Sequence, residues 1–95
     1  MFIGILSLEL RLHAVFSLKE KRKISNSLRQ KIRNKFNVSV AETENMDSKS
    51  ELILAIAMVC NDRQKIDSTL NKVSIMVDAA TDQEISDVRL EIFGA

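Results

Sequence analysis

A chain of 95 residues with a formal net charge of +1 has room for one domain with a modest core. Its content of 45% hydrophobic and 28% charged residues is ordinary for a soluble globular protein, and no apolar run approaches a membrane span. Because it has two glycines, no proline and one cysteine, the sequence excludes a glycine-rich phosphate loop and an intramolecular disulfide.

The segment from Phe2 to Leu12 is predicted to be a strand, because apolar and polar residues alternate along it. It has no basic region before its apolar residues and it contains Glu9, so we expect no signal peptide. The single cysteine, Cys60, suits a reducing compartment. We therefore expect a cytoplasmic protein.

A helix is predicted to follow. Ser17 and Glu20 have the spacing of a capping box, which indicates a helix start at Ser17. Apolar residues then recur at every fourth position and make a buried stripe: Ile24, Leu28 and Ile32. We expect Lys21 and Lys35 to extend their charged ends to solvent beside this stripe, and Asn37 to end the helix in a left-handed cap.

This predicted helix is strongly basic. Between positions 19 and 35 eight basic residues accompany one acid, Glu20, so the local charge is +7. Residues 36–95 hold five basic and eleven acidic groups, or −6. A positive surface on an otherwise acidic small domain is typical of proteins with a polyanionic partner, most often nucleic acid.

Two strands joined by a polar turn are predicted next. The first covers residues 38–42, the turn covers 44–49, and the second strand covers 50–59. Both faces of the second strand are apolar, which indicates a central position in the sheet.

A second helix and a last strand complete the pattern. The pair Asn61 and Gln64 predicts the helix start, and the apolar positions Ile66, Leu70, Val73 and Val77 recur at helical spacing. A loop over 79–83 and a strand containing Val88, Leu90 and Ile92 follow. The order βαββαβ with right-handed crossovers predicts a single α+β domain over residues 1–95, of the ferredoxin-like fold, with a four-stranded antiparallel sheet and two helices on one face.

The segment SLKEKRKISNSLRQKIRNKFNVSVAE, which follows the strand LSLELRL, resembles the YlxP-like bacterial family, a domain of unknown function. The later VCND adds to the resemblance, which covers nearly the whole chain and implies a ferredoxin-like fold. In many genomes the family's genes lie among those for translation initiation and ribosome maturation factors, which implies a connection with RNA or the ribosome. The resemblance brings no catalytic residue, and HAVF departs from the Pro/Gly-containing turn of relatives.

The basic helix is the candidate nucleic-acid interface. Its arginines offer forked contacts to phosphates, and such contacts make affinity depend on salt. The alternative is a solvated face balanced by acids elsewhere in the fold. The residues expected to contact phosphates are Lys19, Lys21, Arg22, Lys23, Arg29 and Arg33.

The sheet face away from the helices is the second candidate surface. Base stacking of the kind seen in RNA-recognition domains is disfavoured, because no aromatic residue lies at its centre. Its small and aliphatic residues suit protein packing, so we expect a homodimer through this face or through strand edges. The alternative is a small patch partly covered by the C-terminal residues. The expected interface residues are Ile3, Ile5, Ala55, Ala57 and Val59.

The remaining chemical groups point to no reaction. His13 is expected to be a loop residue and Cys60 a small buried hydrophobe, because no base accompanies the thiol. One Cys and one His do not make a zinc site, and Glu42, Glu44 and Asp47 lack the spacing of a calcium loop. We expect no metal, no cofactor and no catalytic residue.

The sequence therefore predicts a non-enzymatic cytoplasmic homodimer that binds RNA or a ribosomal particle through its basic helix, with no membrane partner and no small-molecule substrate. Two alternatives stay open. One is a protein-interaction module with an acidic protein partner, and the other is a small-ligand or enzymatic domain at a dimer interface.

Overall fold

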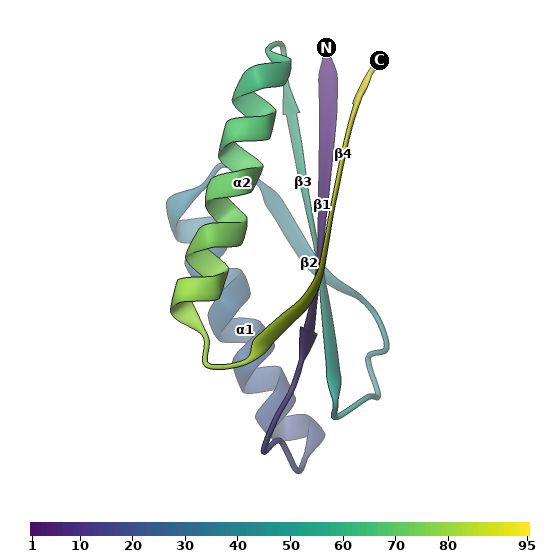
Figure 1. Cartoon of the computed structure of the whole chain (residues 1–95), viewed down its shortest axis with the longest axis vertical. Coiled ribbons are helices and arrows are strands. Elements are labelled where there is room, and N and C mark those ends of the chain that lie inside the picture. Colours follow the sequence, from purple (N-terminus) through teal and green to yellow (C-terminus); the bar gives the residue numbers. More distant parts are fainter.

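The computed structural model describes residues 1–95 as one four-stranded sheet with two helices on the same face (Figure 1). The elements are β1 (Phe2–Arg11), α1 (Leu18–Lys35), β2 (Ser39–Glu44), β3 (Glu51–Cys60), α2 (Arg63–Ala80) and β4 (Glu84–Gly94). All neighbouring strands are antiparallel, and their order in the sheet is β2-β3-β1-β4. The predicted ferredoxin-like fold is confirmed.

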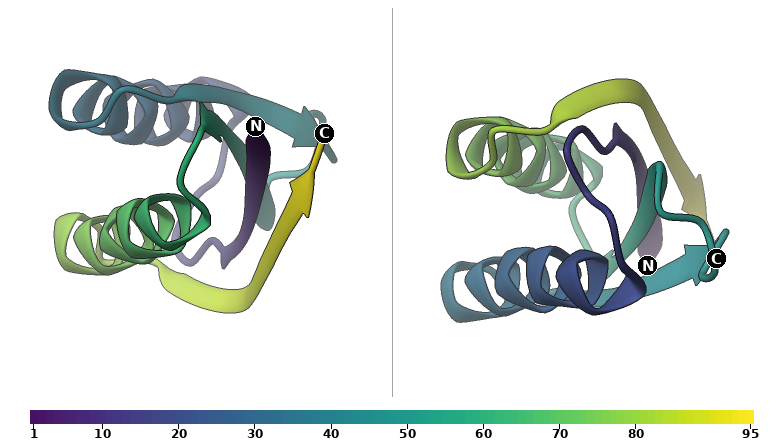
Figure 2. Two further views of the ribbon diagram at one scale, coloured as in Figure 1. Left: turned by 90° about the horizontal axis from the view of Figure 1, so that it is seen from above. Right: turned by 90° about the horizontal axis from the view of Figure 1, so that it is seen from below.

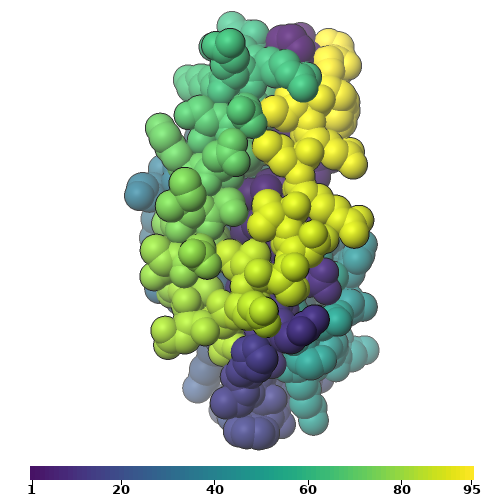
Figure 3. Space-filling model, viewed as in Figure 1, coloured from purple at the N-terminus to yellow at the C-terminus, as the bar shows by residue number.

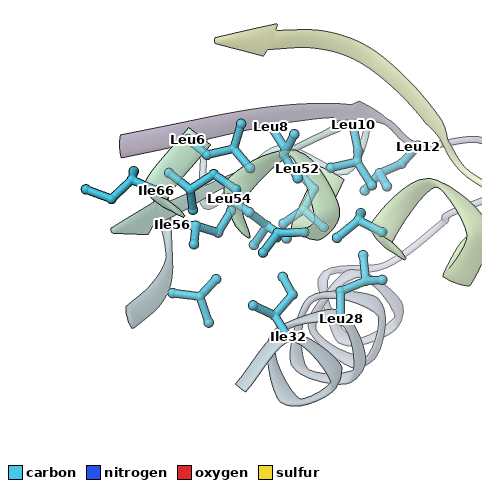
Figure 4. Packing of buried hydrophobic residues seen from close by; sticks show 14 residues of the cluster. Leu6, Leu8, Leu10, Leu12, Leu28, Ile32, Leu52, Leu54, Ile56 and Ile66 are labelled. Atoms are coloured by element: carbon cyan, nitrogen blue, oxygen red, sulfur yellow. The ribbon is translucent and has the colours of Figure 1, made fainter. Parts of the chain in front are cut away.

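The core lies between the sheet and the two helices. Every second residue of β1 faces the helices, and Leu6, at its centre, lies opposite Ile56 of β3 and Leu90 of β4. Figure 4 shows the labelled side chains of β1 and β3 on the same side of the sheet as Leu28 and Ile32 of α1. The alternation along each strand therefore sets which sheet face is covered and which is open.

Helix α2 lies closest to the sheet at Gly4 of β1. A Cβ atom at this position would lie 2.2 Å from Cγ2 of Ile66 and 2.8 Å from Cδ1 of Leu70. The missing side chain therefore lets the helix approach the strand, which is a known use of glycine. Along the outside of the molecule, α2 adjoins β4 (Figure 3).

Some element ends differ from the prediction. Helix α1 ends at Lys35, and its C-cap Phe36 is extended, with φ −126°. Asn37 is not left-handed; among non-glycine residues only Ala14 (φ 59°) and Asn45 (φ 54°) have positive φ. The chain passes into β2 within a few residues of the helix end, which leaves no room for a left-handed cap.

The second helix and the last strand also begin at different residues. The cap of α2 is Asp62 rather than Asn61, since its carboxylate accepts the N–H of Gln64 at 3.0 Å. Strand β4 begins at Glu84, well before Val88, because its ladder with β1 continues past an irregularity beside Glu9. Neither helix combines the length and apolar character that crossing a bilayer requires.

Candidate nucleic-acid interface

The start of α1 is held by the predicted cap. Oγ of Ser17 accepts the N–H of Glu20 at 3.1 Å, and Oε2 of Glu20 accepts the N–H of Phe16 at 2.8 Å. In a regular capping box the carboxylate would accept the N–H of Ser17; here it accepts the N–H of the preceding residue, Phe16. This arrangement satisfies backbone donors of the first turn and uses the one acid of the basic segment for a structural task.

Six of the eight basic side chains of the segment are exposed, one is half-buried and one is buried. The half-buried residue is Arg29 and the buried one is Lys21. Helix α1 therefore presents a surface of positive charge to solvent, made by Lys19, Arg22, Lys23, Lys31, Arg33 and Lys35. We call these six residues the basic surface of α1.

Lys21 does not belong to this surface, which corrects the expectation that it contacts phosphate. The residue is 1% exposed, and its Nζ donates to the carbonyl of Asn45 at 2.7 Å and to that of Met46 at 3.4 Å. Nζ also lies 3.1 Å from Oε2 of Glu42, which makes an ion pair, although that oxygen accepts no directed hydrogen bond. Lys21 thus ties α1 to the β2–β3 turn, and the side chain of its partner Glu42 is 9% exposed.

A signal for this inward lysine is present in the sequence. The buried residues of α1 are Lys21, Ser25, Leu28 and Ile32, whose spacings of four, three and four residues are those of one helix face. Lys21 was expected to turn its charge outward because lysine is almost never fully buried without a partner. The partners are the carbonyls of a distant turn, which the local pattern does not reveal.

Arg29 and Arg33 lie on the side of α1 next to β2. Nε of Arg29 donates to Oγ of Ser25 at 3.1 Å, and a second nitrogen of Arg29 donates to Oδ1 of Asn26. Nη2 of Arg33 donates to the carbonyl of Val40 at 2.9 Å, on the edge strand β2. A guanidinium has five N–H donors, so both residues keep donors for an external acceptor while their position is held.

The five residues expected on the dimer interface all lie on the open face of the sheet. The register places Ile3 opposite Val59, Ile5 opposite Ala57, and Ala55 two residues further along the same face. Ile5 and Val59 are 38% and 64% exposed. The C-terminus does not cover them, because the N–H of Ala95 donates to the carbonyl of Met1 at 2.9 Å and the residue stays beside the strand end.

The other end of the open face is polar. A hollow of about 160 Å³ there is lined by Glu9, Glu44, Asp87, Arg89, Ser7 and Ile53. Nε of Arg89 donates to Oδ2 of Asp87 at 2.9 Å. No group of three or more His, Cys, Asp or Glu side chains is close enough to hold a metal ion.

His13 and Cys60 lie far apart. His13 follows the C-terminal end of β1, where its Nε2 is 3.6 Å from Oε2 of Glu84 and its backbone exchanges hydrogen bonds with the Gln83 amide. Cys60 lies opposite Phe2, at the other end of the strand, and is half-buried rather than fully buried. The fold thus separates the one imidazole from the one thiol.

Known proteins resemble this chain in sequence or in fold. Uncharacterized protein YlxP of Bacillus subtilis (strain 168) is 31% identical over 91 residues, which cover 96% of this chain and 99% of that protein. The de novo designed protein Foldit4 has a TM-score of 0.57 at 11% identity, with 98% of both chains covered. A putative antibiotic biosynthesis monooxygenase from Deinococcus radiodurans has a TM-score of 0.53 at 14% identity, with 100% of this chain and 92% of that chain covered.

At these low identities the two solved structures are evidence for the fold alone. The resemblance carried by SLKEKR and NVSVAE is confirmed by the relative from Bacillus subtilis. The family model described as a protein of unknown function (DUF503) matches residues 3–90, and the chain belongs to that family.

Proposed function

We propose that the protein binds RNA, free or within a ribosomal particle, through the basic surface of α1. The observation that carries this proposal is that no residue of the basic surface has an acidic partner within the fold. The ion pairs of the fold are His13–Glu84, Lys21–Glu42 and Arg89–Asp87, and none includes a residue of the basic surface. None of the eleven acids of residues 36–95 thus forms an ion pair with the basic surface, which favours RNA binding over the alternative of a solvated face balanced by acids.

Lysines and arginines that form no ion pair with a carboxylate of the protein are free to bind phosphates. Each phosphate that they neutralise releases counterions, which makes the affinity fall as salt rises. Arg29 and Arg33 are already positioned by Ser25 and Val40, so less side-chain entropy is lost when their free donors bind. Contacts of this kind position a nucleic acid without reading its sequence.

Cosedimentation with ribosomal subunits, followed by binding to purified RNA across a salt series, tests this proposal. The variant Arg22→Glu/Lys23→Glu reverses the charge of two exposed residues whose side chains form no ion pair within the chain. We expect the slope of log affinity against log salt to fall in magnitude by about 1.4 to 1.8, from two lost phosphate contacts.

The matched control is Lys49→Glu/Arg63→Glu, which changes the net charge equally on exposed residues outside α1 that take part in no ion pair. We expect it to retain most of the binding. Equal losses in the two variants, or wild-type binding that ignores salt, would reject α1 as the phosphate site.

We also propose that two copies of the chain join through the apolar end of the open face. Three exposed apolar residues gather there beside Ile3 and Ala57, which is an arrangement typical of an interface: Ile5, Val59 and Phe93. Because both helices cover the opposite face (Figure 2), such a dimer leaves both copies of α1 open to RNA.

Light scattering over a range of concentrations tests the dimer. Ala57→Glu places a charge among the apolar residues and should halve the mass, whereas the exposed Ala79→Glu on α2 should leave the mass unchanged. A wild-type monomer, or an Ala57→Glu protein of unchanged mass, would reject this interface.

A further inference from the structure

Two adjoining hollows lie between α2 and the end of α1. The first has a volume of about 350 Å³ and is lined by Lys35, Phe36, Lys72, Ile75, Met76 and Ala79. The second, of about 260 Å³, extends from Lys35 and Phe36 toward Met58, Lys65 and Thr69. They adjoin at Lys35 and Phe36, which line both, and we call the two hollows together the interhelical furrow. The end-on views show the two helices standing apart on the same face of the sheet (Figure 2).

The furrow carries positive charge only. Lys35, Lys65 and Lys72 line it and no acid does, and none of the three lysines takes part in an ion pair. Lys65 and Lys72 are seven residues apart on α2, which is about two turns, or ~10 Å along the axis. Two cations thus follow one side of the furrow, and Lys35 faces them from the end of α1.

The floor of the furrow is apolar. Phe36 borders both hollows, with Nζ of Lys35 5.8 Å from the centre of its ring. Ile75, which is 69% exposed, lines the first hollow together with Met76, Lys35 and Lys72. The furrow therefore combines apolar side chains with lysines. Such a surface suits a ligand that has both an apolar part and an anionic part.

We infer that the interhelical furrow binds a single strand of RNA, with phosphates on its lysines and a base against Phe36 and Ile75. This inference rests on the proposed function, since the basic surface of α1 continues into the furrow at Lys35. A single strand exposes the faces of its bases, and sequence-tolerant proteins bind such strands by combining a positive groove with an aromatic surface. A duplex keeps its base faces stacked inside, so the apolar floor adds nothing to duplex binding.

The test compares a fluorescent RNA strand of about twelve nucleotides with the duplex of the same sequence, by anisotropy. We expect the wild-type protein to prefer the single strand at least fivefold. Lys65→Gln/Lys72→Gln should weaken single-strand binding about tenfold and lower the salt slope by about 1.4. Arg11→Gln/Arg89→Gln makes the same change in charge on the open face, and should leave the preference intact.

Two further variants isolate the floor. Phe36→Leu keeps an apolar side chain and should weaken single-strand binding about fivefold to tenfold, with the salt slope unchanged, because stacking rather than charge is lost. Ile75→Ser changes a residue outside the core and should act in the same direction, so the floor remains testable if Phe36→Leu folds poorly. Neither should alter duplex binding.

The outcomes separate the two proposals. A wild-type protein that binds no RNA rejects the proposed function itself. A second outcome is that the wild type binds RNA, Arg22→Glu/Lys23→Glu loses this binding, and the furrow variants bind like the wild type. The proposed function then stands, but the furrow is not where the RNA strand binds. Equal affinity for the single strand and the duplex also overturns the inference. The furrow would then be better explained as a binding site for an acidic protein surface.

Discussion

The two helices have the same length and cover the same sheet face, yet they are held in different ways. Each has 18 residues and a side-chain cap at its start. Helix α2 buries four apolar residues, Ile66, Leu70, Val73 and Val77, each at 0% exposure. Helix α1 buries only two, Leu28 and Ile32, and completes its inner face with the polar Lys21 and Ser25.

This difference indicates a division of roles. Helix α2 stabilises the fold by apolar burial against β1, whereas α1 is tied to the sheet by hydrogen bonds from Lys21 and Arg33. Three basic residues near the start of α1, Lys19, Arg22 and Lys23, also oppose the positive end of the helix dipole. Stability alone does not favour such a helix, which is consistent with a surface used for binding.

The largest effect is expected in the core of α2. Leu70→Ala removes a fully buried side chain beside Gly4 and leaves an enclosed cavity, so the free energy of unfolding should fall by about 3–5 kcal/mol. The matched change Leu28→Ala in α1 should cost about 2 kcal/mol, because Leu28 borders a surface hollow and the space that it leaves would not be enclosed. Urea unfolding measures both, and a larger loss for Leu28 would reverse the comparison.

The second effect tests the polar tie of α1. Lys21→Met keeps the apolar stem but leaves the Glu42 carboxylate and two carbonyls without their donor, so we expect a loss of about 3 kcal/mol. Lys21→Met/Glu42→Leu removes both charges and should recover more than half of this loss. A double-mutant cycle in urea measures the coupling. Additive losses would mean that the charges do not interact.

The third effect tests how closely α2 approaches the sheet. Gly4→Ala places a methyl group against Ile66 and Leu70, and the β-branched Ile66 has little freedom to turn away. Overpacking of this kind should cost about 2 kcal/mol in thermal or urea unfolding. The control Gly94→Ala meets only the Phe2 ring at 3.7 Å and should change stability by less than about 0.5 kcal/mol.

The comparison of the two helices also shows which features of the fold could be predicted from the sequence. The order of the elements follows from the change between strand and helix periodicity along the chain. The open face follows from the alternation along β1, because a strand with one buried face admits a single register. The cap at Ser17 was also predicted, since it depends on neighbours three residues away. These features depend on residues that are close together in the chain, so local sequence patterns are enough to predict them.

The features that were not predicted depend on long-range contacts. The burial of Lys21 requires the carbonyls of Asn45 and Met46, some 25 residues away in the chain. The charge balance of α1 depends on where the fold places the acids, and the only ion pair that reaches this helix joins Glu42 to the buried Lys21. The interhelical furrow joins residues of α1, α2 and β3, so no single segment of the sequence displays it.

The smallest effect is expected at the helix caps, and it tests whether they contribute to the difference between α1 and α2. Ser17→Ala removes the acceptor of the Glu20 N–H and should cost about 1 kcal/mol, and Asp62→Ala should cost α2 about the same. Thermal unfolding of the two variants measures this. Equal losses mean that both helix starts are equally well held, so that the difference between the helices lies in their buried faces. A much larger loss for Ser17→Ala would instead mean that α1 depends on its own first turn, and the polar ties through Lys21 and Arg33 would then be the weaker restraint.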